Sequence, residues 1–181
     1  MRHLIDFGDL TRAEWESLYQ RCSDIMDHPA DFMDACRGRV MASLFYEPST
    51  RTNFSFQTAM LRVGGTVFGF ADPKSTSTAK GETLKDTIKM VSGYADVVVM
   101  RNPKEGAAKA ASLYSDVPVI NAGDGGHMHP TQTTADLTTI TRLRGKVDGL
   151  SVGLCGDLKN GRTVHSLIKA LAKFEGIKFF L

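Results

Sequence analysis

Short apolar runs alternate along this chain with longer segments in which apolar residues recur at helical spacing. Runs that are apolar throughout are typical of strands buried on both faces, and the periodic segments between them predict helices. The repeated order of strand and helix indicates an α/β fold, with a parallel sheet covered by helices on both faces. The strands are expected at residues 40–44, 66–70, 96–100, 117–121, 150–155 and 177–181.

The first predicted helix begins at a capping box, in which Thr11 caps the helix and Glu14 stands three residues later. Five residues then recur at helical spacing and are expected to face a core, with Trp15 acting in packing. They are Trp15, Leu18, Cys22, Ile25 and Met26. Later helices are expected after Pro48 and at residues 83–94, 107–114, 130–144 and 163–174, and residues 72–82 are expected to form an exposed, mobile loop.

The segment Ser49 to Thr52 lies between a predicted strand and a predicted helix. The helix is indicated by an apolar face, Phe56, Ala59, Met60 and Val63, that follows the segment. Unpaired N–H groups and the helix dipole favour an anion at such a turn, and the guanidinium of Arg51 suits phosphate or carboxylate. The same residues also fit a plain helix cap, and this segment alone does not separate the two interpretations.

Three further polar groups follow strands or loops. Arg101 ends a strand, His129 and Gln132 flank the start of the helix at Pro130, and Lys80 and Glu82 lie in the loop. Taken singly, each fits a solvated charge or a helix cap. Because parallel sheets bind ligands at the carboxyl ends of their strands, their shared placement favours one pocket for an anionic, activated substrate.

Composition and motifs exclude several other classes of function. The formal net charge is only +2 with no basic run, which argues against nucleic acid, and no apolar run is long enough for a membrane helix. The spacing of His127 and His129 does not support a metal site, and residues 156–162 lack the GxGxxG and GK[ST] fingerprints. We therefore expect no metal and no cofactor. The three cysteines form no CxxC and indicate reduced thiols in a cytoplasmic protein, with Cys155 expected in a core.

The last predicted strands are too few to complete a domain. A break is expected at residues 146–149, and the sequence ends on the apolar run 179–181. We expect a first domain at residues 1–129, a connecting helix at 130–145 and the beginning of a second α/β domain at 146–181.

Six ordered blocks of sequence resemble the catalytic subunits of the aspartate carbamoyltransferase family, and the resemblance runs along all 181 residues. The blocks are FYEPSTRT at 45–52, KGETLKDT at 80–87, ADVVVMR at 95–101, NAGDG at 121–125, HPTQ at 129–132 and GDLKNGRTVHSL at 156–167. The resemblance implies transfer of the carbamoyl group of carbamoyl phosphate to L-aspartate, in pyrimidine biosynthesis. It also implies a cytoplasmic homotrimer and allows for regulatory chains as partners.

The resemblance implies a role for each matching residue. Arg51, Thr52, Lys80, Arg101 and His129 would be the catalytic residues. Lys80 would act in the site of a neighbouring subunit, and Lys80 and Arg162 would bind aspartate. The carbamoyl phosphate site would consist of Ser49, Thr50, Arg51, Thr52, Arg101, His129 and Gln132.

The sequence departs from the family pattern at a few positions. Asn53 stands where many relatives carry arginine, and Ser75, Thr76 and Ser77 all lie near the family's loop serine, so that contact is not assigned. The family's remaining aspartate ligands would lie beyond residue 181, so we expect these 181 residues alone not to be fully active.

Two alternatives remain. A related transferase that uses ornithine shares the STRT and HPTQ blocks, although residues 80–83 and 156–165 favour aspartate. A fragment of this length could also serve only in carbamoyl phosphate binding or assembly, without activity.

Overall fold

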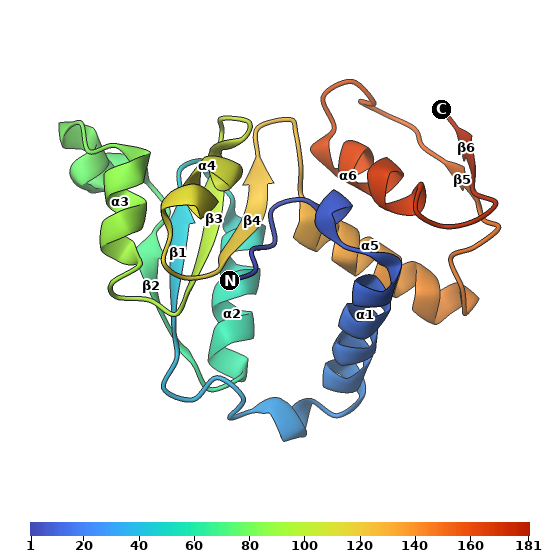
Figure 1. Cartoon of the computed structure of the whole chain (residues 1–181), viewed down its shortest axis with the longest axis horizontal. Helices are drawn as coiled ribbons and strands as arrows, with labels where there is room; N and C mark the ends of the chain where they lie inside the picture. Colours follow the sequence, from blue (N-terminus) through green and yellow to red (C-terminus); the bar gives the residue numbers. More distant parts are fainter.

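Two parallel sheets form the framework of the computed structural model, which describes all residues from 1 to 181 (Figure 1). The larger sheet has four strands in the order β2-β1-β3-β4, and the smaller sheet pairs β5 with β6. The predicted α/β class with a parallel sheet is therefore confirmed. The strands are β1 (Val40–Phe45), β2 (Thr66–Phe70), β3 (Val97–Asn102), β4 (Val119–Asp124), β5 (Ser151–Gly153) and β6 (Lys178–Phe180).

Six α-helices cover or flank the sheets, and four short 3-10 helices lie between other elements (Figure 1). The capping box predicted at Thr11 and Glu14 is present, and Pro130 is the first residue of its helix. The α-helices are α1 (Arg12–Asp27), α2 (Thr50–Arg62), α3 (Leu84–Val91), α4 (Ala107–Tyr114), α5 (Pro130–Arg144) and α6 (Arg162–Leu171). The 3-10 helices are η1 (Phe7–Asp9), η2 (Pro29–Phe32), η3 (Pro73–Ser75) and η4 (Ser77–Lys80).

The larger sheet is covered on both faces, because successive side chains of a strand point to opposite sides. Ala42 and Leu44 of β1 pack in one core with buried residues of α3 and α4. Met41 and Phe45 pack in another with Met60 of α2. The central strand β1 therefore supplies both cores.

A third core lies outside the larger sheet and joins both ends of the sequence. Phe7 and Trp15, near the N-terminus, pack with Leu137 of α5 and Leu171 of α6. Leu4 forms an isolated parallel bridge with Ile120 of β4, so the N-terminal segment contacts the sheet before it enters this core. The domain boundaries at residues 129 and 145 stay a prediction.

Several burial predictions were wrong, each because of where the element ends or which face it turns to a core. Only the first turns of α1 reach the third core, so Ile25 and Met26 near its C-terminal end are exposed. Ala59 is exposed as well, because α2 turns the neighbouring positions 56 and 60 toward the sheet. Cys155 is exposed rather than buried, since β5 ends at Gly153 and residue 155 belongs to the turn that follows.

The predicted loop at residues 72–82 is exposed along most of its length, but it contains η3 and η4. Each short helix begins with a polar cap: the side chain of Asp72 accepts from the Lys74 N–H, and that of Thr76 accepts from the Thr78 N–H. Such capped turns do not need apolar residues at regular spacing, so the hydrophobic pattern did not indicate these two short helices.

Replacing Leu137, which is fully buried in the third core, should lower the free energy of unfolding. We expect Leu137→Ala to cost about 3 kcal/mol, because it removes apolar contact and leaves a cavity. Leu143→Ala, on the same helix but at a position that is 79% exposed, should change stability by less than about 0.5 kcal/mol. Urea denaturation of both variants checks this, and equal losses would contradict the assignment of α5 to a core.

Candidate functional site

The carboxyl ends of β1 and β3 lie side by side and bring a glutamate to an arginine. Phe45 is in register with Arg101, so Glu47, two residues beyond β1, reaches the Arg101 side chain. The Arg101 Nε donates to Glu47 Oε1 at 2.7 Å, and the Arg162 guanidinium donates to the same oxygen at 3.1 Å. All three side chains are at least three-quarters buried, which strengthens these charge-assisted bonds.

The two arginines also flank the backbone of Gly123 in β4. A Cβ atom at this glycine would lie 3.4 Å from Arg101 Nη1 and 3.4 Å from Arg162 Cζ, and its φ of +113° is a conformation that side chains rarely adopt. Burial lowers the pKa of Arg101, the nearby positive charge of Arg162 lowers it further, and Glu47 opposes both effects. The backbone conformation therefore favours glycine at the position that lies against both guanidinium groups.

His129 lies beside this pair at the start of α5. It is 7% exposed, its backbone N–H donates to Ser166 Oγ at 2.7 Å, and its Nδ1 lies 3.3 Å from Thr131 Oγ1. Burial lowers the pKa of His129 to about 4, and the charges of Arg101 and Arg162 add to this effect. The imidazole is therefore neutral at pH 7, with one nitrogen able to donate and the other able to accept.

The N-terminus of α2 forms a separate polar surface. Ser49 is the N-cap residue, yet its side chain makes no capping hydrogen bond. The first bond into the helix is from the Asn53 N–H to the Ser49 carbonyl at 3.0 Å, so the N–H groups of residues 50–52 have no helical acceptor. This geometry favours the anion-site interpretation, because a plain cap would use the serine hydroxyl.

The structure brings some predicted site residues together and leaves others apart. Arg101, His129 and Arg162 converge, as described above. Gln132 is exposed and donates to Asp136 at 2.9 Å. Lys80 lines a cleft of about 660 Å³ with Phe68 and Phe70, and its segment lies at the opposite end of the molecule from α6 (Figure 1).

Sequence reasoning did not single out Glu47 as a functional residue. One feature of the sequence could have indicated it: an acidic residue lies between an apolar strand and Pro48, at the same edge of the predicted sheet as Arg101. Asn53, noted only as a departure, is buried and accepts hydrogen bonds from Ser43 Oγ and Gln57 Nε2, both at 2.8 Å. It therefore ties α2 to β1.

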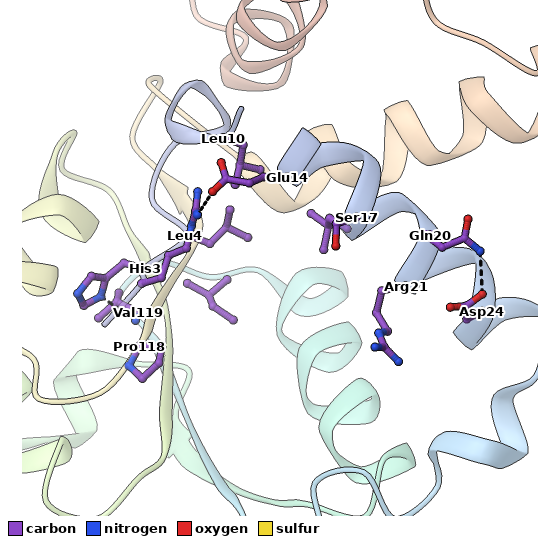
Figure 2. Close-up of a pocket in the computed structure, with 13 residues that line it drawn as sticks. His3, Leu4, Leu10, Glu14, Ser17, Gln20, Arg21, Asp24, Pro118 and Val119 are labelled. Carbon is purple, nitrogen blue, oxygen red and sulfur yellow. Dashed lines mark hydrogen bonds and ion pairs between the residues drawn. The ribbon is translucent and has the colours of Figure 1, made fainter. Parts of the chain in front are cut away.

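A further cleft of about 800 Å³ lies between the N-terminal segment, α1 and the beginning of β4 (Figure 2). Among its charged groups, Arg2 pairs with Glu14, Asp24 accepts from Gln20, and Arg21 lies over the ring of Phe32. Pro118 and Val119 place it at the amino end of β4, remote from Asp124 at the carboxyl end. This cleft offers no convergent donors for an anion.

Two other kinds of site find no support in the geometry. No three His, Cys, Asp or Glu side chains are grouped so that they could hold a metal ion. None of the helices has the length and apolar character needed to cross a membrane.

The protein has an α/β fold in which cationic side chains converge at the carboxyl ends of a parallel sheet. Residues 2–142 match the family model described as "Aspartate/ornithine carbamoyltransferase, carbamoyl-P binding domain". The chain therefore belongs to the aspartate/ornithine carbamoyltransferase family.

Its similar relatives include catalytic subunits of aspartate carbamoyltransferase. The chain is 56% identical over 180 residues to that of Clostridium perfringens and 57% identical to that of Clostridium acetobutylicum. Each alignment covers 99% of this chain and 59% of the relative, so the chain spans about three fifths of the relatives' length.

Solved structures of the same kind share the fold. The catalytic subunit of M. jannaschii aspartate transcarbamoylase has a TM-score of 0.90 at 50% identity, with 99% of this chain and 59% of that chain covered. The Trypanosoma cruzi aspartate transcarbamoylase, solved with carbamoyl phosphate and aspartate, has a TM-score of 0.93 at 40% identity, with 99% and 57% covered.

The depressed pKa of His129 should appear in the stability of the protein. Between its folded pKa of about 4 and its ordinary value of 6.5, the unfolded state binds more protons at this residue. The free energy of unfolding should therefore fall as the pH is lowered from 7 to 4, and His129 should account for up to about 3 kcal/mol of that fall.

Denaturation of wild type and His129→Gln across this pH range isolates the contribution, because other titrating groups are common to both. The wild type should lose more stability than the variant as the pH falls. Parallel curves would contradict a buried, neutral His129.

Proposed function

We propose that the site binds carbamoyl phosphate and that the protein transfers its carbamoyl group to L-aspartate, giving N-carbamoyl-L-aspartate and phosphate in pyrimidine biosynthesis. The observation that carries the proposal is the convergence of Arg101, Arg162 and neutral His129 at the sheet edge that also carries the N-terminus of α2. The matched family and the names of the similar relatives support the same substrates.

The phosphate would bind at the N-terminus of α2. Backbone N–H groups and the hydroxyls of Ser49, Thr50 and Thr52 are donors suited to its oxygens, and Arg51 is exposed with no ion-pair partner to compete. Arg101 and His129 would donate to the carbamoyl oxygen, and Gln132 would contact the carbamoyl amide after leaving Asp136. Arg101 is charged and His129 is buried, which suits an anion that must be held out of water.

The proposed reaction is a direct displacement. The neutral amine of aspartate attacks the carbamoyl carbon, and the negative charge that develops on the carbonyl oxygen is stabilised by Arg101 and His129. The bond to the phosphate oxygen then breaks, phosphate leaves with the bonding electrons, and the proton of the nitrogen passes to the departing phosphate or to water. Since the chain itself supplies no nucleophile, positioning and electrostatic stabilisation would account for most of the catalysis.

Arg162 would bind a carboxylate of aspartate. Its guanidinium donates to the Glu47 carboxylate and to the Gly125 carbonyl, and a substrate carboxylate would compete with these two acceptors. Binding would therefore rearrange the contacts of α6. The proposed division is a carbamoyl phosphate domain at residues 1–129, a connecting helix at 130–145 and part of an aspartate domain at 146–181.

The proposal includes a homotrimer in the cytoplasm, with Lys80 acting in a neighbouring subunit and with regulatory chains as possible partners. Lys80 is exposed and lies away from Arg101 and His129 of its own chain, which suits a role in another subunit. Lys80 would then contribute to aspartate binding and catalysis only in the assembly.

Calorimetric titration with carbamoyl phosphate tests the binding site. We expect Arg51→Ala and Arg101→Ala each to weaken binding at least about tenfold, because each removes a charge-assisted contact to the ligand. The control is Arg37→Ala, since Arg37 is exposed and pairs only with Asp34. A wild-type affinity in both site variants would contradict the proposal.

The amine acceptor is tested separately, with aspartate and ornithine each supplied together with carbamoyl phosphate to the assembled enzyme. We expect product only with aspartate, and Arg162→Ala should raise the KM for aspartate with little effect on carbamoyl phosphate affinity. Product only with ornithine would assign the chain to the other branch of its family.

A further inference from the structure

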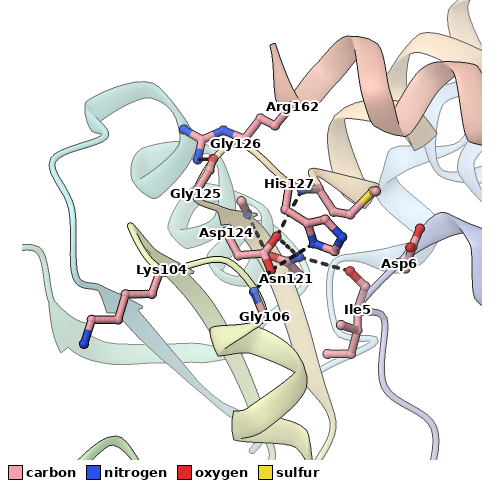
Figure 3. Close-up of polar contacts among 12 residues, drawn as sticks. Ile5, Asp6, Lys104, Gly106, Asn121, Asp124, Gly125, Gly126, His127 and Arg162 are labelled. Atoms are coloured by element: carbon pink, nitrogen blue, oxygen red, sulfur yellow. Dashed lines mark hydrogen bonds and ion pairs between the residues drawn. The ribbon is translucent and has the colours of Figure 1, made fainter. Parts of the chain in front are cut away.

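The turn at residues 125–129, which carries His129, is held from below by one buried carboxylate (Figure 3). Asp124, at the end of β4, is 1% exposed. Its Oδ1 accepts from Asn121 Nδ2 at 3.0 Å and from the Met128 N–H at 3.1 Å. Its Oδ2 accepts from the Gly106 N–H at 2.8 Å and lies 3.4 Å from His127 Nδ1. The second half of the turn, at His127 and Met128, is therefore tied to a single side chain.

The same turn is held from above by the first two turns of α6. Three side chains of this helix each contact one backbone group of the turn. The contacts are Arg162 Nη1 to the Gly125 carbonyl at 2.6 Å, His165 Nδ1 to the Gly126 carbonyl at 3.2 Å, and the His129 N–H to Ser166 Oγ at 2.7 Å. The turn is thus clamped between β4 and α6.

We propose that Asp124 and Ser166 are positioning residues that clamp the turn at 125–129 from opposite sides and so fix His129 and the backbone carbonyl that orients Arg162. Both side chains are 1% exposed and act through their bonds to the turn. For catalysis the inference rests on the proposed function, whereas its structural part concerns only the placement of His129.

Every side-chain oxygen of both residues is hydrogen-bonded, which a mere space-filling role would not require. Ser166 is 1% exposed, accepts from the His129 N–H and donates to Met128 Sδ at 3.4 Å. Alanine at this position leaves a buried N–H without an acceptor. At Asp124, an asparagine has only one acceptor oxygen, so the N–H of either Gly106 or Met128 loses its acceptor.

The clamp also explains how one turn serves two substrates. Asp124 and Asn121 fix it to the larger sheet, since Asn121 donates both to Asp124 and to the Ile5 carbonyl at 3.0 Å. Ser166 fixes it to the helix that carries Arg162. If a substrate carboxylate bound Arg162 and moved α6, the hydrogen bond from the His129 N–H to Ser166 would therefore move His129 as well.

The test uses Asp124→Asn, Ser166→Ala and the milder Ser166→Cys, with Ser112→Ala as a matched control. Ser112 is a helix serine whose hydroxyl bonds only its own helix, to the Lys109 carbonyl. The first readout is NMR titration of the five histidine rings, with His129 assigned from the resonance missing in His129→Gln. The second is the affinity for carbamoyl phosphate by calorimetry.

In wild type and Ser112→Ala, the His129 ring should not titrate between pH 8 and pH 5.5, because its pKa is about 4. In the clamp variants the loosened turn exposes the ring to water, and its midpoint should rise by at least about one pH unit toward the ordinary value. Carbamoyl phosphate affinity should fall about 5- to 20-fold, the effect of one lost or misdirected hydrogen bond.

An unchanged His129 titration in any folded clamp variant, with an affinity within twofold of wild type, would overturn the inference. If Asp124→Asn does not fold, the two Ser166 variants decide, and Ser166→Cys keeps the volume of the site nearly constant. If wild type itself does not bind carbamoyl phosphate, the proposed function fails, while the titration alone still accepts or rejects the clamp.

Discussion

A single carboxylate oxygen, on Glu47, holds together the two guanidinium groups around which the site is built. Arg101 comes from the larger sheet and Arg162 from α6, and without an anion between them their charges would repel in a largely buried setting. The parallel order of β1 and β3 places Glu47 next to Arg101, and Gly123 leaves room for both side chains. Burial, with a further contribution from the same pair of charges, lowers the pKa of His129 and keeps it neutral.

The site therefore lies where two packing units meet. The cores on either side of the larger sheet fix the strand ends and the N-terminus of α2, whereas the third core fixes α5 and α6. His129 belongs to both units, since it begins α5 directly after the turn that follows β4, and its N–H bonds to α6. A rotation of one unit relative to the other would change the distances between the site residues without unfolding any of the three cores.

Much of this arrangement could be predicted from the sequence, because it depends on patterns that are local. Apolar runs and capping residues located the elements, and the rule that parallel strands present their carboxyl ends at one edge placed Arg101 beside the segment after β1. The resemblance then named the residues that would contact substrate. Arg101, His129 and Arg162 do converge.

The rest depends on contacts between residues far apart in sequence, which no periodicity encodes. Glu47 resembled an ordinary charge before a proline until the register of β1 and β3 paired it with Arg101. Ser166 resembled one more position in a helix, and Cys155 resembled a core residue, because each outcome is decided by where α6 and β5 dock.

The most direct test is a crystal structure of the protein with N-(phosphonacetyl)-L-aspartate, which joins features of both proposed substrates. We expect the phosphonate at the N–H groups of residues 50–52, the adjacent carbonyl oxygen within hydrogen-bonding distance of Arg101 and His129, and a carboxylate on Arg162. A phosphonate bound elsewhere, for instance in the cleft between α1 and β4, with Arg101 and Arg162 still sharing Glu47, would contradict the proposed site.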